Sequence, residues 1–320
     1  MVIELAEIQA ARARIEGVAL RTPLVRLQAS AAAEIHLKLE CLQPIGSFKI
    51  RGALNAVRAH IEQADSMPEA LVTASAGNMA QGVAWAAREL GLPARIVIPA
   101  HAPQAKIRAI ERLGGEPVPV PYDRWWQAIV TSRADGIDGL FVHPVQDEAV
   151  MAGNGTIGLE ILEDLPDVDA VVIPFGGGGL TCGIASAVRA LKPDTRIITA
   201  EPETGAALCA AIRAGEPTEV DYQPSFVDGS GSRRVLDTMW PRVRDLIDGA
   251  TAVPLGDVAA AIRLIAERAH VIAEGAGALA AAAALAGDAG AGKVVCIVSG
   301  ANIDLEKLAE ILASPGGGAP

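Results

Sequence analysis

Strand patterns alternate with helix patterns along most of this chain of 320 residues. Short apolar or alternating runs predict strands over 34–40, 70–74, 94–98, 169–175, 196–200 and 294–298. Longer runs with apolar residues three or four apart predict helices over 4–16, 48–59, 79–90, 102–113, 180–191, 205–214, 258–270, 277–285 and 305–312. Because strands that alternate with helices form parallel sheets covered on both faces, the sequence predicts an α/β fold. A Gly/Pro-rich stretch over 314–320 predicts a loose tail.

Composition narrows the classes of function open to this chain. Hydrophobic residues make up 51%, enough for a sizeable core, and the formal net charge is −11. Such an acidic chain lacks the basic stripe that neutralises nucleic-acid phosphates, and the apolar run 276–286 is too short to span a membrane. The charged N-terminus does not resemble a signal peptide, and four scattered cysteines are typical of free thiols in a reducing compartment. We therefore expect a cytoplasmic protein that binds neither nucleic acid nor a membrane.

Three loops directly follow apolar strands of the predicted sheets. They cover residues 75–78, 176–179 and 299–302. Ligands of parallel α/β sheets bind beyond the carboxyl ends of the strands. We therefore expect these three loops to lie together at a binding site.

Four consecutive glycines form the second of these loops, between Phe175 and Leu180. Glycines let backbone N–H groups converge, and the helix that follows adds the positive end of its dipole, so the segment is typical of a phosphate site. The alternative is a plain tight turn or linker. A dinucleotide fingerprint G-x-G-x-x-G fails here, because its third glycine falls on Thr181 or Cys182. A near match to the Walker loop at 287–294 has Val294 where Ser or Thr should hold magnesium.

Lys49 follows a glycine-containing turn at the start of a predicted helix, beside Phe48. If the amine is buried, its lowered pKa makes it a nucleophile toward a carbonyl group. If it is solvated, it is an ordinary helix lysine. The residues by themselves leave both interpretations open.

Several motifs, in chain order, resemble those of fold-type-II pyridoxal-phosphate (PLP) enzymes. They are Gly46-Ser-Phe-Lys-Ile-Arg-Gly-Ala53, the asparagine loop over 73–82, His143-Pro with 152–156, the tetraglycine, Glu201-Pro, 274–278 and 299–302. More narrowly, the chain is similar to the threonine dehydratase and serine racemase family, and the resemblance covers nearly its whole length. It implies a fold like that of the tryptophan synthase β-subunit, with two three-layer domains that each contain a parallel sheet and an active site between them. It also implies a large PLP-binding domain of residues 1–69 plus 148–320, a small domain of residues 70–147, and a homodimer.

The resemblance also implies which residues bind the cofactor. Lys49 would bind PLP covalently, Asn78 would hydrogen-bond its ring oxygen, and Ser299 would face its pyridine nitrogen. A neutral hydroxyl at that nitrogen would leave it unprotonated and weaken the electron sink. The remaining contacts would come from Phe48, Gly229 and Glu274 around the ring, and from the N–H groups of Gly176, Gly177, Gly178, Gly179 and Leu180 at the phosphate.

Three residues are implied to act on the substrate: Lys49, Ser75 and Glu274. Ser75 and its neighbouring N–H groups would bind the carboxylate of an amino acid, and Glu274 would lie near the cofactor. The Lys49 amine would remove the Cα proton as a general base, after which the β-hydroxyl leaves. The products would be a 2-oxo acid and ammonia, so the resemblance implies a dehydratase, or ammonia-lyase, acting on a β-hydroxy amino acid.

This chain departs from the family pattern at a few positions. Racemases of the family carry a serine where this chain has Ala76, so the sequence favours elimination over racemisation. Met79 stands where histidine is frequent. The family's metal site uses a glutamate, which Glu201 matches, and a second acid, which Ala207 replaces. A divalent cation, Mg or Ca, therefore stays open, with Glu201 as its possible ligand.

Other functions and several substrates remain open from the sequence. On the same scaffold, the alternatives are an amino-acid racemase and a β-replacement enzyme. From another class, the alternative is a non-catalytic α/β protein that binds a phosphate or nucleotide through the tetraglycine. Serine, threonine, 3-hydroxyaspartate and phenylserine all fit a β-hydroxy amino-acid substrate.

Overall fold

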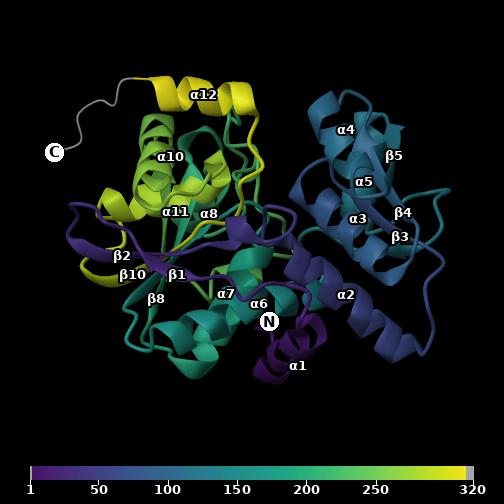
Figure 1. Ribbon diagram of the computed structural model, residues 1–320, viewed down its shortest axis with the longest axis horizontal. Coiled ribbons are helices and arrows are strands. Elements are labelled where there is room, and N and C mark those ends of the chain that lie inside the picture. The colour runs from purple at the N-terminus through teal and green to yellow at the C-terminus, as the bar shows by residue number, and fades with distance from the viewer. Residues whose placement is uncertain (1, 315–320) are drawn as a thin grey trace.

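The computed structural model describes residues 2–314 and contains two separate sheets, which lie in the left and right halves of Figure 1. The six-stranded sheet has the order β1 (Leu24–Arg26), β2 (Ala33–Lys38), β10 (Gly292–Ile297), β7 (Ala170–Pro174), β8 (Arg196–Pro202) and β9 (Gly249–Val253). The four-stranded sheet has the order β5 (Gly115–Val120), β4 (Ala94–Pro99), β3 (Leu71–Ala74) and β6 (Leu140–Phe141). Neighbouring strands are parallel except β1 and β2. The predicted parallel α/β architecture is confirmed.

Helices cover both faces of the six-stranded sheet because its central strands are apolar on both sides. In β7, Val172 packs into one hydrophobic cluster, whereas Val171 and Ile173 pack into another. The first cluster is closed by α10 (Leu255–Arg268), α11 (Gly275–Leu285) and α12 (Leu305–Ala313). The second is closed by α1 (Leu5–Ile15), α6 (Glu148–Asp164), α7 (Gly179–Leu191) and α8 (Ala207–Ala214), with α9 (Trp240–Val243) beside them.

The four-stranded sheet is covered in the same way. On one face lie α2 (Lys49–Ala64), α3 (Asn78–Leu90) and α4 (Gln104–Glu111), and on the other lies α5 (Tyr122–Thr131). Two short 3₁₀ turns, Glu40–Leu42 and Glu203–Gly205, follow β2 and β8 respectively. Within residues 2–314, no helix is both long enough and apolar enough to cross a membrane. The tail predicted over 314–320 lies, apart from Ser314, outside the described residues.

All of the predicted strands and helices are present, with ends shifted by a few residues, but several elements were not predicted. The strand β5 contains Pro117 and Pro119, which argue against a central strand and are tolerated here because β5 is the edge of its sheet. The helix α6 contains Gly153, Gly155 and Gly158, which lower its intrinsic helix propensity. These glycines instead let α6 pack closely: a Cβ on Gly155 would lie 2.9 Å from the Gly183 carbonyl oxygen on α7.

The predicted domain limits of 1–69 plus 148–320 and 70–147 stay a prediction. All four strands of the smaller sheet lie within 70–147. However, Ile50, Leu54 and Val57 of α2 belong to the same hydrophobic cluster as Leu71 and Ile96. Figure 1 shows α2 running alongside the smaller sheet's helices toward the six-stranded half of the molecule, so this helix contacts both units.

A buried group of charged side chains joins α2 to the six-stranded half. The Arg51 guanidinium donates to Glu40 Oε1 and Oε2 at 2.8 Å each, and to Glu160 Oε1 and Oε2 at 2.6 and 2.9 Å. Lys38 Nζ lies 2.6 Å from Glu160 Oε2, and Thr22 Oγ1 donates to Glu40 Oε1 at 2.6 Å. Two positive and two negative charges therefore neutralise each other out of contact with water, with Arg51 only 1% exposed. Burial, the largest single effect, raises the pKa of Glu40, but the charge and hydrogen bonds of Arg51, together with Thr22 and Lys38, outweigh it and hold that pKa below its usual value.

Replacing Arg51 by Met should destabilise the protein strongly, because Glu40 and Glu160 would remain buried without their cation. Breaking a buried ion pair by removing one partner costs about 3–5 kcal/mol. The matched control is Arg12→Met on α1, because the exposed pair of Arg12 with Glu163 should contribute less than about 1 kcal/mol. Urea unfolding followed by circular dichroism measures both free energies of unfolding. Equal losses in the two variants would contradict a structural role of the buried group.

Candidate active site

Two loops that are far apart in the sequence pair with each other and fix the start of α2. Ser47 and Gly300 form an isolated antiparallel bridge, and the Phe48 N–H donates to the Ser299 carbonyl oxygen at 3.1 Å. The loop that follows β10 therefore lies against the turn that precedes Lys49. This pairing places the predicted residues Phe48, Lys49 and Ser299 in one site.

The Lys49 amine lies in a confined environment, although the side chain is only half-buried overall. Its Nζ donates to the Pro144 carbonyl oxygen at 3.0 Å and lies 5.0 Å from the centroid of the Phe48 ring. Burial disfavours the charged ammonium and lowers the pKa of Lys49 to about 8. Of the two interpretations that the sequence left open, the structure favours the buried nucleophile.

The tetraglycine lies between β7 and α7 and leaves no room for side chains at Gly177 and Gly179. Gly178 has φ +95°, a left-handed conformation that favours glycine. A Cβ on Gly177 would lie 2.4 Å from Val145 Cγ2, and one on Gly179 would lie 2.7 Å from the Val145 carbonyl oxygen. The first N–H groups of α7, which start at this loop and include that of Leu180, have no acceptors within the helix. The loop therefore has the form of an anion cradle closed on one side by Val145.

The turn that supports both Lys49 and the glycines was not predicted from the sequence. His143 Nδ1 accepts hydrogen bonds from the N–H groups of Val145 and Gln146 at 3.0 and 2.9 Å, and its Nε2 lies 2.9 Å from the Ile129 carbonyl oxygen. Burial holds the pKa of His143 at about 4, so the ring is neutral and its Nε2 carries the proton. The His-Pro pair at 143–144 was the available sequence signal, but it did not indicate this role.

Asn78 connects the loops after β3 and β10. Its Nδ2 donates to Glu274 Oε1 at 2.8 Å, and its Oδ1 accepts from Asn302 Nδ2 at 2.7 Å. Asn302 also donates to the Ile45 carbonyl oxygen at 2.9 Å, which ties this chain of contacts to the turn before Lys49. Two of the three predicted loops therefore meet, as expected from the carboxyl ends of their strands.

Glu274 lies at the centre of this arrangement and is buried. A Cβ on Gly300 would lie 2.5 Å from Glu274 Oε1, and one on Gly229 would lie 3.2 Å from the same atom. Burial, and after it the negative charge of Asp228, raises the pKa of Glu274 to about 8, against the opposing hydrogen bond from Asn78. Glu274 therefore carries a proton at neutral pH.

Gly229 lies between Glu274 and the remaining predicted loop, the tetraglycine at 176–179. A Cβ on Gly176 would lie 3.4 Å from the Gly229 carbonyl oxygen. Ser299, whose carbonyl oxygen accepts the Phe48 N–H, is buried. Ser75 lies in a half-buried turn, where its Oγ accepts a hydrogen bond from the Gly77 N–H at 3.2 Å. The structure thus places the predicted site residues around one region, reached from both sheets.

Two buried hydroxyl groups beside the site lack a hydrogen-bond partner among the residues described. They are Ser47 Oγ, next to the turn before Lys49, and Thr181 Oγ1, in the first turn of α7. Buried polar atoms are nearly always paired in proteins. Unpaired groups at these two places are consistent with a polar ligand that spans Lys49 and the tetraglycine.

Glu201, the possible metal ligand, has another role in the structure. Its Oε1 and Oε2 accept from the N–H groups of Leu208 and Cys209 at 3.0 and 2.9 Å, at the start of α8. These hydrogen bonds and the helix dipole favour a carboxylate, but burial outweighs them and raises the pKa of Glu201 to about 7. No group of three or more His, Cys, Asp or Glu side chains suited to a metal occurs between residues 2 and 314.

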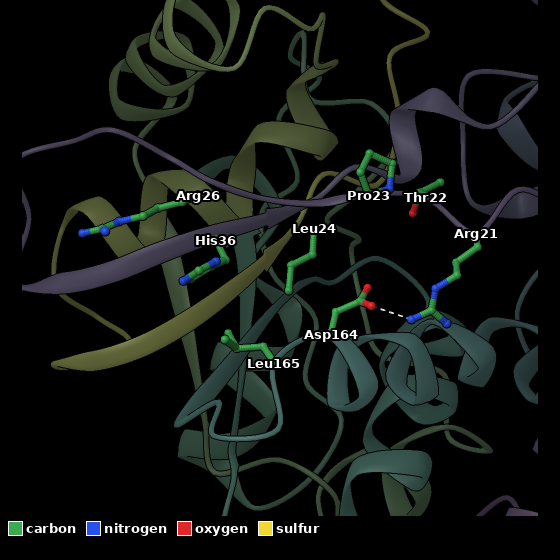
Figure 2. Close-up of a pocket in the computed structure, with 8 residues that line it drawn as sticks. All are labelled: Arg21, Thr22, Pro23, Leu24, Arg26, His36, Asp164 and Leu165. Carbon is green, nitrogen blue, oxygen red and sulfur yellow. Dashed lines mark hydrogen bonds and ion pairs between the residues drawn. The ribbon is translucent and has the colours of Figure 1, made fainter.

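A separate pocket of about 550 Å³ lies at the outer edge of the six-stranded sheet (Figure 2). It is lined by Arg21, Thr22, Pro23, Leu24, Arg26, His36, Asp164 and Leu165. Figure 2 shows the Arg21 side chain directed at Asp164, with which it pairs at 2.5 Å. None of the predicted site residues lines this pocket, so we do not consider it the active site.

Comparison with known proteins agrees with the motifs and with the geometry. A family model described as pyridoxal-phosphate dependent enzyme matches residues 15–300. An L-threonine ammonia-lyase of Thermotoga maritima is 39% identical over 97% of this chain and 78% of its own length, and the serine racemase of Mus musculus is 38% identical over 96% and 93%. The solved structure of maize serine racemase has a TM-score of 0.88 at 32% identity and covers 97% of both chains. The predicted fold type is confirmed.

The lowered pKa of Lys49 predicts an unusually reactive amine in protein freed of any bound ligand. Only the neutral amine is nucleophilic, so its reductive methylation should rise with pH to a midpoint near 8. Nα-acetyl-lysine in the same buffers should have its midpoint near the ordinary value of about 10.4. Mass spectrometry of the peptide that contains Lys49 measures the rate. A midpoint shared with the free amino acid would contradict burial of the amine.

Proposed function

Because the chain belongs to the family of pyridoxal-phosphate dependent enzymes, we propose that it converts a β-hydroxy amino acid to a 2-oxo acid and ammonia. The observation that carries this proposal is the Lys49 amine, which is partly desolvated and held beside an anion cradle. Similarity to an L-threonine ammonia-lyase along nearly the whole chain supports it further.

The residues around Lys49 fit pyridoxal phosphate. We propose that the N–H groups of Gly176 to Gly179 and of Leu180 hold the phosphate, because a side chain on Gly177 or Gly179 would collide with Val145. Phe48, Asn78, Gly229, Glu274 and Ser299 would surround the ring. When bound, the cofactor takes up the amino group of a substrate and withdraws electrons from its Cα.

The chain's own residues would then carry the proton transfers. Lys49 would remove the Cα proton, and its lowered pKa makes a neutral amine available at mildly alkaline pH. The turn at Ser75, whose backbone N–H groups lie beyond β3, would bind the substrate carboxylate. Glu274 would keep its own proton at neutral pH and donate a hydrogen bond rather than add a negative charge to the site.

A second candidate is amino-acid racemisation, which the similarity to serine racemases favours. Racemisation needs a second group that delivers a proton to the opposite face of Cα. The methyl group of Ala76, in the loop after β3, has no proton to deliver. Elimination is therefore the first proposal, and β-replacement remains a further alternative on this scaffold.

The proposal also covers the domain limits, the oligomeric state and the cellular location. The two sheets would mark two domains, 1–69 plus 148–320 and 70–147. The protein would act as a homodimer, which sedimentation measures directly. A cytoplasmic location is supported by Cys41, Cys182, Cys209 and Cys296, all of which are buried free thiols.

The function is tested by the release of 2-oxo acid and ammonia from serine, threonine, 3-hydroxyaspartate and phenylserine. Wild type should release both products from at least one of them, and Lys49→Ala should lower kcat by several orders of magnitude because the base is lost. Lys307→Ala on α12, an exposed lysine in a surface ion pair, is the matched control and should keep full activity. Protein that contains PLP but forms D-amino acid without oxo acid would instead establish racemisation.

The sequence left open a divalent cation bound through Glu201. Because both oxygens of Glu201 already accept backbone N–H groups, we expect treatment with a chelator to leave activity and the thermal unfolding midpoint unchanged. Restoration of lost activity by Mg²⁺ or Ca²⁺, but not by Na⁺, would show that a cation site exists.

A further inference from the structure

An ion pair connects the two halves of the molecule at the candidate active site. Lys106 lies on α4, over the four-stranded sheet, and Asp228 lies in the loop that precedes Gly229 in the other half. Lys106 Nζ and Asp228 Oδ2 are 2.5 Å apart. The side chains are 37% and 52% exposed, so the pair faces solvent rather than the core.

The position of Asp228 in the loop places its charge next to the site. The following residue, Gly229, fits between Glu274 and the tetraglycine: a Cβ on Gly229 would lie 3.2 Å from Glu274 Oε1, and its carbonyl oxygen lies near Gly176. The charges of the pair also reach Glu274, because Asp228 raises the pKa of that carboxyl and Lys106 lowers it. The ion pair is therefore part of the electrostatic environment of the site.

Such an exposed pair contributes little to stability. Pairs of this kind are worth about 0.2–1 kcal/mol, because each partner is well solvated when alone. Their effect on selectivity can be larger, since a charge beside a binding site repels ligands of the same sign. An acidic substrate side chain would meet the carboxylate of Asp228 and a lysine whose charge is already neutralised.

We propose that the Lys106–Asp228 pair makes the site select amino acids with a neutral side chain and reject those with an acidic one. This inference rests on the proposed function, in that the ligand is an amino acid bound between the two sheets. Asp228 supplies the repulsion. Lys106 does not attract an incoming carboxylate, because its ammonium group already forms an ion pair with Asp228.

The test compares L-asparagine with L-aspartate, which have nearly the same shape and differ in charge. Neither has a β-hydroxyl group, so binding is measured without dehydration. Dissociation constants are determined by calorimetry on the PLP-loaded protein. Wild type should bind asparagine more tightly than aspartate.

Asp228→Asn should shift the ratio of the two dissociation constants toward aspartate by up to about fivefold, the most that a single exposed charge pair supports. Adding Lys106→Met to this variant should make the shift smaller, because the freed cation is then absent and only the loss of repulsion by Asp228 remains. Asp135→Asn is the control, since Asp135 forms a more exposed ion pair with Arg133 at 2.7 Å, and it should leave the ratio unchanged. Thermal unfolding midpoints verify that each variant is folded.

Three outcomes would overturn the inference: an unchanged ratio in Asp228→Asn, the same shift in Asp135→Asn, or a shift of undiminished size when Lys106 is also replaced. Failure of the proposed function is distinguishable from these. A protein that releases no oxo acid, yet shows the ratio shift only in Asp228→Asn, would retain the charge selection and lose the dehydratase assignment.

Discussion

The buried ion pairs of Arg51 are the interaction on which the active-site geometry depends. Arg51 lies in the first turn of α2, two residues after Lys49. It pairs with Glu40, in the 3₁₀ turn after β2, and with Glu160 on α6. A guanidinium with two carboxylates in fixed geometry leaves α2 little freedom to rotate or slide. The position of the Lys49 amine is therefore set largely by charges that never contact a substrate. Hydrophobic packing alone would hold the helix but would specify its orientation less sharply.

Electrostatic balance also explains how an acidic protein could hold an anion at the proposed phosphate site. The chain carries a net charge of −11, yet the two carboxyl groups beside Gly229 are neutralised in different ways. Glu274 keeps its proton because it is buried, and Asp228 is paired with Lys106. The tetraglycine supplies backbone N–H groups, which attract an anion without any basic side chain. Local dipoles, rather than overall charge, determine what such a site can bind.

Much of the fold could be predicted from the sequence because apolar periodicity and chain order reflect burial directly. The run that forms β7, the glycines after it and the turn at Lys49 all carry local signals. The edge strand β5 did not, because its prolines are tolerated only at an edge that tertiary structure defines. The helix α6 was missed because its glycines reflect contacts with α7, not local preference. Likewise, the support that Val145 gives to the glycines follows from a steric contact between distant segments, which no spacing in the sequence indicates.

The pairing of β2 with β10 has a consequence for synthesis on the ribosome. Residues 33–38 pair with residues 292–297, and the loop after β10 hydrogen-bonds with the turn before Lys49. The β1–β2 hairpin forms the outer edge of its sheet and contacts the remaining strands through β10. In the nascent chain, one edge of β2 therefore stays unpaired until residues 292–297 have emerged, which is a long-lived exposure of strand edge that favours chaperone binding. The residues around Lys49 consequently reach their final arrangement only after residues 292–297 have emerged and paired.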